Sequence, residues 1–407
     1  MKEKKKILVV CQYFYPEQFR INDICVEMVK RGYDVTVVTG IPNYPMGDFF
    51  DGYGWTKKRK EEYKGVRIIR IPIIPRGHKT STLILNYISY VVSGFFWNIF
   101  TKIRADKVFI FQLSPMTQAL IGVWYAKKRK IPCTIYVQDL WPDSVEAITG
   151  IHNSKIIRVI DKMVNYVYKN CDSILATSPS FVSNIENRIS AWSTDGKSKV
   201  SYCPQYAEAF YVPASSQNIS DLKKANIFRV VFTGNVGYAQ GLDILPKVAN
   251  VLMERNVECE FVIVGDGRYL DELKNDTVEK QVQSMFCFLG RKKPEDIPMY
   301  LANCDIAFIS FAQNALYDMT IPAKLQSYMA CKMPILAVAG GETKRIVEEA
   351  KCGICCGYND IEQVVNSIIN LKNNPASLEE MGKNAFTYSC SFFDGEKILD
   401  QLEKYME

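Results

Sequence analysis

Hydrophobic and polar positions alternate along the first half of the chain in two kinds of segment. Short runs rich in Val, Ile and aromatic residues, bounded by turn residues, predict five strands; they lie at residues 7–11, 34–39, 107–112, 134–138 and 173–177. Helical spacing between them predicts helices, such as residues 22–31 before Gly32 and residues 117–130 before Pro132. Alternating strands and helices indicate right-handed crossovers onto a parallel sheet.

The second half repeats this pattern. Its apolar strands mostly end in Gly or Ser, and their sequences are RVVFTG, EFVIVGDG, MFCFLG, DIAFIS and PILAVAGG. Helical stretches follow, for example at residues 241–255 and 294–303. A segment near residues 202–220, with Pro204, Pro213 and a Ser/Gln/Asn cluster, has the composition of a linker. The pattern therefore predicts an α/β protein of two Rossmann-like domains with parallel sheets, ending in an amphipathic helix at residues 392–406.

One segment is unusually apolar. Residues 82–100 (TLILNYISYVVSGFFWNIF) carry no charge and are flanked by basic residues on both sides. Their length is that of a marginal transmembrane helix, but they contain two Asn and two Ser and lie between predicted strands of one sheet. The sequence leaves three readings open: a helix packed in the domain, a helix partly dipped into the membrane interface, and a spanning helix.

Charge is distributed unevenly between the two halves. Residues 1–205 carry 30 Lys and Arg against 17 Asp and Glu, whereas residues 206–407 carry 20 against 27. A basic half favours an anionic partner, either nucleic acid or a membrane surface with anionic lipids, and the run at residues 57–60 (KKRK) adds to this attraction. A solvated surface without a partner is the alternative.

The cysteines and histidines argue against several kinds of site. There are 13 Cys and two His, and the sequence begins without the apolar region of a secretory signal, so we expect free thiols in the cytoplasm. Cys352 and Cys355 form a C-x-x-C without a second pair at zinc spacing. No D-x-D or G-x-S-x-G is present, so we expect no bound metal and no serine hydrolase triad.

Glycines at strand ends indicate a phosphate site in the second half. The first strand is followed by CQYFYPEQFRIND rather than G-x-G-x-x-G, which disfavours a nicotinamide or flavin site. The second half has TGNVGYAQG at residues 233–241 and VGDG at residues 264–267, after successive strands. Because phosphates bind where parallel strands lead into helix N-termini, this recurrence predicts one nucleotide in the second domain.

These motifs resemble a known family. VVFTGNVGYAQGLDILPKVANVL, VIVGDG, FLGRKKPEDIPMYLANCDIAFIS and IPAKLQSYMACKMPILAVAGGETKRIVEEAKCG resemble the donor domain of family 4 glycosyltransferases with the GT-B fold. YFYPEQFRINDICVEMVKRGYDVTVVTGIPNYPMGDFFDGY and VQDLWPDSV resemble the acceptor domain of the bacterial envelope-polysaccharide branch, in particular transferases of N-acetyl-fucosamine-type sugars in O-antigen and capsule assembly. The resemblance implies an acceptor domain at residues 1–205, a donor domain at residues 206–387, and a C-terminal helix within 388–407 that returns to the first domain.

The resemblance also implies roles for individual residues. Lys324 would contact the diphosphate, and Asp139 would face the donor sugar or acceptor hydroxyl. Apart from the resemblance, Arg20 follows a predicted strand and precedes a predicted helix, where a phosphate-directed cation could lie, so we place it on the acceptor or phosphate side. Glycines and their neighbours would shape the donor pocket: Gly234, Asn235, Gly237 and Gln240 near the diphosphate, Gly265, Asp266 and Gly267 at the nucleoside, and Gly290 and Arg291 at the base. From the residues alone, Lys324 and Arg20 also fit exposed surface positions, and Asp139 also fits a turn cap.

The chain departs from the family pattern at four positions. Asn235 and Gln240 stand where most members carry cations, and Met319 and Ser327 stand where most carry paired glutamates. We expect Glu342 to replace the glutamate that holds the ribose. Lys324 and Arg291 would then be the main cations at the diphosphate.

The resemblance implies a retaining, metal-independent hexosyltransferase without a cofactor. A UDP-sugar would be its co-substrate and an undecaprenyl-diphosphate-linked saccharide its acceptor, in O-antigen or capsule biosynthesis. Such an enzyme would be a peripheral protein on the inner face of the cell membrane and would not bind nucleic acid. A nucleotide-sugar epimerase of similar fold and a non-catalytic, membrane-bound assembly subunit are the alternatives.

Overall fold

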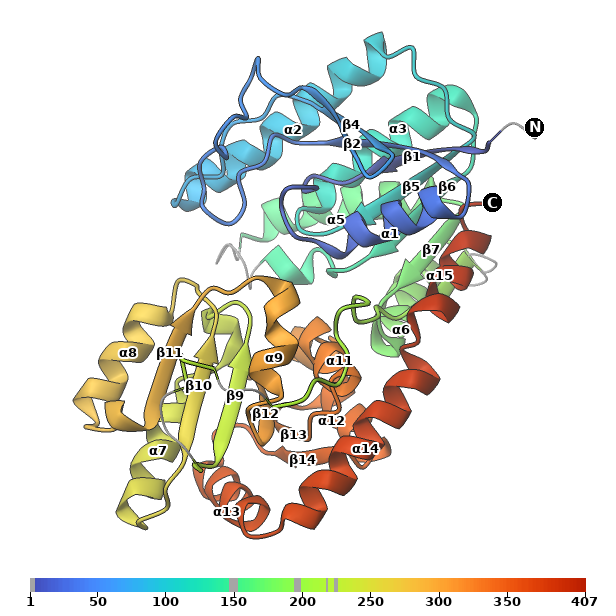
Figure 1. Cartoon of the computed structure of the whole chain (residues 1–407). Coiled ribbons are helices and arrows are strands. Elements are labelled where there is room, and N and C mark those ends of the chain that lie inside the picture. The colour runs from blue at the N-terminus through green and yellow to red at the C-terminus, as the bar shows by residue number, and fades with distance from the viewer. Residues whose placement is uncertain (1–3, 146–152, 194–198, 217–218, 223–225) are drawn as a thin grey trace. The chain divides into compact units, whose positions relative to one another are not determined.

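The chain divides into two compact units, each described separately here. The structure is a computed structural model that describes residues 4–145, 153–193, 199–216, 219–222 and 226–407. The first unit comprises Met1–Pro204 with Leu399–Glu407, and the second comprises Gln205–Ile398 (Figure 1).

The first unit contains a mainly parallel sheet with the strand order β3-β4-β2-β1-β5-β6-β7-β8. Only the β3–β4 pair is antiparallel among the described strands. The strands are β1 (Lys6–Val10), β2 (Asp34–Thr39), β3 (Lys60–Tyr63), β4 (Val66–Arg70), β5 (Lys107–Gln112), β6 (Cys133–Val137), β7 (Ser173–Ala176) and β8 (Val200–Tyr202). The helices are α1 (Arg20–Lys30), α2 (Thr80–Phe100), α3 (Ala119–Arg129), α5 (Ser154–Lys169) and α6 (Pro179–Ser190).

The second unit contains a parallel sheet with the order β11-β10-β9-β12-β13-β14. Its strands are β9 (Arg229–Thr233), β10 (Glu260–Val264), β11 (Phe286–Gly290), β12 (Ile306–Ser310), β13 (Ile335–Val338) and β14 (Gly353–Cys356). Its helices are α7 (Ile244–Glu254), α8 (Leu270–Glu279), α9 (Ile297–Leu301), α10 (Ala315–Asp318), α11 (Ala323–Ala330), α12 (Gly341–Glu349), α13 (Ile361–Lys372) and α14 (Pro375–Phe392).

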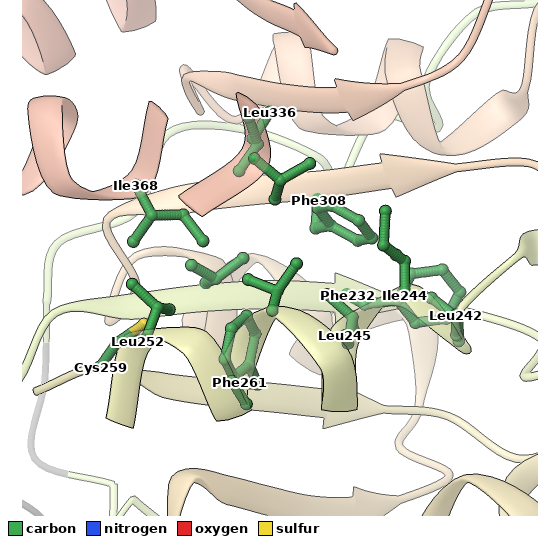
Figure 2. Close-up of a cluster of buried hydrophobic side chains, with 14 of the residues drawn as sticks. Phe232, Leu242, Ile244, Leu245, Leu252, Cys259, Phe261, Phe308, Leu336 and Ile368 are labelled. Atoms are coloured by element: carbon green, nitrogen blue, oxygen red, sulfur yellow. The ribbon is translucent and has the colours of Figure 1, made fainter. Parts of the chain in front are cut away.

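Side chains of the second sheet alternate between two apolar layers. Phe232, Phe261 and Phe308 point to one face, where they pack with residues of α7 and α13 (Figure 2). Val231 and Val262 point to the other face, against α9, α11 and α12. A sheet covered on both faces has strands that are apolar throughout, which is why these strands were predictable from their composition. The predicted pair of Rossmann-like domains is thereby confirmed.

The C-terminal residues join the first unit. Residues 388–407, expected to hold one returning helix, contain the end of α14 and then α15 (Gly395–Lys404), and only Leu399–Glu407 group with the first unit. A guanidinium N–H of Arg31 donates to the carboxylates of Asp400 and Glu403, both at 2.6 Å, which ties this helix to the end of α1.

Candidate active site

The predicted glycine motifs of the second unit meet at the carboxyl ends of β9, β10 and β11. Gly234 follows β9, and its N–H donates to the carbonyl of Val264 at the end of β10, at 2.9 Å. A Cβ atom added at Gly265 would lie 1.8 Å from the carbonyl oxygen of Gly234. Only glycine therefore fits at position 265, because any side chain would force the two strand ends apart.

The rest of the two loops is held by backbone contacts. The N–H of Val236 donates to the carbonyl of Asp266 at 2.9 Å, and a Cβ at Gly267 would lie 2.3 Å from the carbonyl oxygen of Val236. Gly237 lies beside the side-chain amide of Asn235, where an added Cβ would be 2.7 Å from Nδ2. Asn235 and Asp266 are exposed. The loops thus form a close-packed backbone platform whose polar side chains face solvent.

Lys324 is brought to the same edge by α11. Its Nζ donates to the side-chain oxygen of Gln240 at 2.5 Å and lies 3.7 Å from the centroid of the Phe232 ring. A Cβ added at Gly234 would be 3.9 Å from this Nζ. Three predicted site residues, Gly234, Gln240 and Lys324, therefore lie together although 90 positions separate the first from the last in the sequence.

The surroundings of Lys324 do not compensate its charge. Among the described residues, no carboxylate lies within ion-pair distance of its Nζ, and desolvation holds the pKa of Lys324 well below its ordinary value. A partly buried cation with a neutral partner is destabilised, and a bound anion would offset that cost. The site is therefore chemically suited to an anionic ligand.

Gly290 and Arg291 lie at the neighbouring strand end. Gly290 closes β11, is paired with Val264, and has a φ of +63°. Among the described residues, none comes within 4 Å of a Cβ added there, and Arg291 is exposed. The β10 and β11 ends thus form one continuous edge.

Glu342 occupies the first turn of α12. Its carboxylate is only 4% exposed and accepts a hydrogen bond from the Nε of Arg345 at 2.9 Å. The preceding glycine, Gly341, lies against the carbonyl of Asp318, which brings the start of α12 beside α10. Glu342 is thus a paired carboxylate near the segment that follows β12.

In the first unit, Asp139 lies just after β6. Its carboxylate accepts the N–H of Ser114, which follows the neighbouring strand β5, at 2.7 Å. Burial raises the pKa of Asp139 above its ordinary value. Ser114 in turn accepts the indole N–H of Trp141 at 3.0 Å. Arg20, the first residue of α1, is buried at 8% exposure.

Sequence reasoning missed Glu17, a buried carboxylate of the first unit. It accepts three backbone N–H groups, from Phe14, Asn43 and Tyr44, at 3.2, 2.8 and 2.7 Å. Burial nevertheless raises its pKa to about 7. This carboxylate joins the loop after β1 to the loop after β2, and no motif in the sequence distinguishes it from an exposed loop glutamate.

Beside Glu17, an aromatic cluster surrounds Arg76. The guanidinium of Arg76 donates to the hydroxyl of Tyr13 at 3.2 Å and lies 5.2 Å from the centroid of the Tyr44 ring. Tyr13 also stacks on Phe19, with centroids 5.4 Å apart. These residues come from loops after β1, β2 and β4, so only the fold brings them together.

Comparison with known proteins decides the family. A model described as "Glycosyl transferases group 1" matches residues 217–388, and one described as "Glycosyl transferase 4-like domain" matches residues 18–192. The chain belongs to the family 4 glycosyltransferases. The protein is accordingly a glycosyltransferase.

Two sequence relatives of this glycosyltransferase match most of its length. WbjE of Pseudomonas aeruginosa, named as a glycosyltransferase, is 24% identical over 76% of this chain and 82% of its own length. WcaI of Escherichia coli (strain K12), named for colanic acid biosynthesis, is 24% identical over 98% of both chains.

Solved structures show the GT-B fold. A sucrose-phosphate synthase from Thermosynechococcus elongatus has a TM-score of 0.71 at 15% identity, over 98% of both chains. Anabaena Alr3699/HepE, solved with UDP-glucose, has a TM-score of 0.68 at 15% identity, also over 98% of both chains.

Proposed function

We propose that this glycosyltransferase moves a sugar, with retention of anomeric configuration, from a UDP-sugar to a lipid-linked saccharide. This proposal rests on one observation: the partly buried side chain of Lys324 is hydrogen-bonded to the neutral side chain of Gln240, at a strand edge lined by glycines. A nucleoside diphosphate is an anion that fits such an edge, because its phosphates can accept from loop N–H groups as well as from the lysine.

The donor site would act mainly on the leaving group. Negative charge grows on the diphosphate as the bond to the sugar breaks, and a preorganised cation stabilises that charge. In our proposal Lys324 supplies this cation, Arg291 adds a second one, and the backbone from Gly234 to Gly237 supplies N–H donors. Glu342 would hold the ribose. Because these side chains and N–H groups stabilise the diphosphate charge, the proposed mechanism requires no metal ion.

The similarity to known proteins supports a UDP-linked donor and an envelope polysaccharide product. The Anabaena structure contains UDP-glucose, and the E. coli relative is named for colanic acid biosynthesis. On the sequence resemblance, we propose an N-acetyl-fucosamine-type donor sugar and a role in O-antigen or capsule assembly. The acceptor would be an undecaprenyl-diphosphate-linked saccharide at the inner face of the cell membrane.

The first unit would bind the acceptor. Ligands of open α/β sheets bind outside the carboxyl ends of the strands, and Asp139 lies at such an end, after β6. Its raised pKa results from desolvation, and a partly buried carboxyl group at this edge is placed to hydrogen-bond a sugar hydroxyl. Arg20 is the first residue of α1, which follows β1, and in our proposal it lies on the acceptor or phosphate side of the site.

A donor screen tests the proposed function. The protein would be incubated with a panel of UDP-sugars and an undecaprenyl-diphosphate-linked GlcNAc acceptor, with and without EDTA, and products read by mass spectrometry. We expect one preferred UDP-sugar and activity that survives EDTA. Conversion of a UDP-sugar without acceptor would indicate an epimerase instead. Failure to bind any UDP-sugar would contradict the proposal.

A further inference from the structure

Helix α2 buries several polar side chains along one side, including Asn86, Tyr90 and Asn98. The side-chain oxygen of Asn86 accepts from the amide of Gln12 at 2.6 Å, and its own amide donates to a backbone carbonyl at 2.6 Å. The hydroxyl of Tyr90 donates to the carbonyl of Cys11 at 3.0 Å, and the amide of Asn98 donates to a carbonyl of α3 at 2.8 Å. The first unit therefore holds α2 by hydrogen bonds along one side.

Close packing adds to this attachment. Gly94, on the same side of α2, faces Ile121 of α3, and a Cβ added there would lie 2.2 Å from the Ile121 side chain. The 21 residues of α2 are long and apolar enough to cross a membrane by composition. The row of buried hydrogen-bonded side chains excludes that arrangement in this fold, since spanning would break the contacts with the sheet.

The opposite side of α2 is an exposed apolar face. Its residues repeat at intervals of three and four, so they form one stripe, and they are Leu85, Ile88, Val92, Phe95, Phe96, Ile99 and Phe100. Phe100 is 75% exposed. Soluble monomers rarely leave contiguous apolar patches of this kind uncovered, so the face indicates a partner.

The apolar face continues onto a basic loop. The N–H of Ile74, which is 40% exposed, donates to the hydroxyl of Ser89 on α2 at 2.9 Å. The indole of Trp55, 60% exposed, donates to the carbonyl of Ile73 at 2.8 Å. Exposed Lys57, Lys58 and Lys60 follow Trp55 in sequence. Tryptophan beside lysines is the composition of protein surfaces that lie at the headgroup level of membranes.

We propose that α2 lies in the plane of an anionic membrane, with this apolar face in the boundary between headgroups and acyl chains. The cations at both ends of α2, Lys79 before it and Lys102 and Arg104 after it, are exposed and would contact anionic headgroups. This inference deepens the proposed function, because a membrane-bound transferase meets a lipid-linked acceptor at that surface.

A second copy of the chain is a poorer occupant. The stripe has the spacing of a helix-pairing seam, but α2 carries no charge along its length that would set a register. Cations flank both ends, so parallel and antiparallel pairing would each bring like charges together. Anionic lipid removes this repulsion.

Vesicle sedimentation with matched variants tests the proposal. Val92→Ser/Phe96→Ser would be compared with Val278→Ser/Phe392→Ser, which replaces the same residue types at similar exposure in the second unit. Vesicles of phosphatidylcholine and phosphatidylglycerol, 7:3, contain no acceptor or UDP-sugar, so binding reports on this face and not on transfer. Donor turnover with a short-chain soluble acceptor tests the proposed function separately.

We expect the α2 variant to lose about 10-fold or more in vesicle partitioning, and the second-unit variant to bind like wild type. Both should keep the wild-type melting temperature, because the replaced side chains are exposed. Lys57→Glu/Lys58→Glu should weaken binding to anionic vesicles only. Undiminished binding by a folded α2 variant would overturn the proposal. The proposal would also be overturned if the wild-type protein formed a dimer that does not bind vesicles and that the α2 substitutions dissociate. It would be overturned as well if both Val92→Ser/Phe96→Ser and the milder single Val92→Ser lost the cooperative melting transition, because these side chains would then belong to the core.

Discussion

The ammonium of Lys324 donates a hydrogen bond of 2.5 Å to the side-chain oxygen of Gln240, a neutral group. Within the described part of the chain, no carboxylate is paired with this lysine. In our account the missing anion is the diphosphate of the donor. The two residues come from different strand ends, after β9 and after β12, so the pair exists only in the folded second unit.

Gln240→Glu should therefore weaken donor binding. The new carboxylate would form an ion pair with Lys324, raise the pKa of that lysine, and repel the diphosphate. We expect UDP affinity to fall about 10-fold or more, a change of about 1.4 kcal/mol, with unchanged or higher thermal stability by calorimetry. Gln283→Glu, on an exposed turn, is the matched control. Equal UDP affinity in the two variants would show that Gln240 does not face the ligand.

The free energy of unfolding of the first unit should depend on Glu17. Its pKa is raised from 4.5 to about 7, so the protonated form is favoured in the folded state. The stabilisation is full below about pH 4.5 and is lost as pH rises through 7, about 3 kcal/mol in all. Glu17→Gln should remove most of this pH dependence, and Asp139, shifted in the same direction, should account for a remainder.

Tryptophan fluorescence isolates this effect. All five Trp residues lie at positions 55 to 192 and therefore report on the first unit alone. Urea unfolding followed by fluorescence between pH 5 and 8 would measure the trend. A wild-type unfolding free energy that rises over this range, or one that Glu17→Gln leaves unaltered, would contradict the assignment.

Gly265→Ala should damage the second unit. The added Cβ would lie 1.8 Å from the carbonyl oxygen of Gly234, and neither backbone segment can move without breaking the pairing of β9 with β10. We expect a loss of about 3 kcal/mol, at the upper end for overpacking, together with loss of UDP binding. Gly357→Ala, whose Cβ would meet the side chains of Asp360 at 3.7 Å and Gln363 at 3.9 Å, both ordinary van der Waals distances, is the control. Scanning calorimetry that shows equal melting of both variants would refute the close approach.

Asp139→Asn should impair transfer without affecting donor binding. The amide can still accept the N–H of Ser114, so the fold should persist. The carboxyl group is lost, and we expect kcat with acceptor to fall about 100-fold, within the range for an acid–base or charge-stabilising group. UDP affinity should stay unchanged. Asp143→Asn, at an exposed position nearby, should behave like wild type. If Asp139→Asn kept full activity, the role of Asp139 would be purely structural, and our assignment would be wrong.

Most of the described strands and helices could be predicted because a sheet buried on both faces requires short, wholly apolar strands, although β14 (GICC) was missed. The β3–β4 hairpin could not, since KEEY in β3 is largely polar and lies at the sheet edge. The helical nature of residues 82–100 was also evident. The sequence did not indicate that the side of this helix with Asn86 and Asn98 is buried and its apolar side exposed. The burial of these two residues depends on hydrogen-bond partners far away in the sequence.

The positions of the candidate site residues divide in the same way, while their roles stay predictions. Gly234, Gly265 and Gly290 could be predicted because strand-end glycines follow the repeating pattern of the fold. The contact of Lys324 with Gln240 spans 84 positions and depends on how α11 packs, which no local pattern encodes. Glu17 was missed for a related reason. Its burial depends on a loop 26 positions later that supplies the N–H groups.

Calorimetric titration of UDP into wild type, Lys324→Ala and the control Lys247→Ala, a half-exposed lysine paired with Asp243, tests the central claim most directly. Wild type and the control should bind equally, and Lys324→Ala should bind about 10-fold or more weakly. Because burial lowers the pKa of Lys324 and a diphosphate would raise it, wild type should also take up protons on binding at a pH between these two pKa values, seen as a buffer-dependent enthalpy that Lys324→Ala lacks. UDP binding of equal strength and equal proton uptake in wild type and Lys324→Ala would contradict the account.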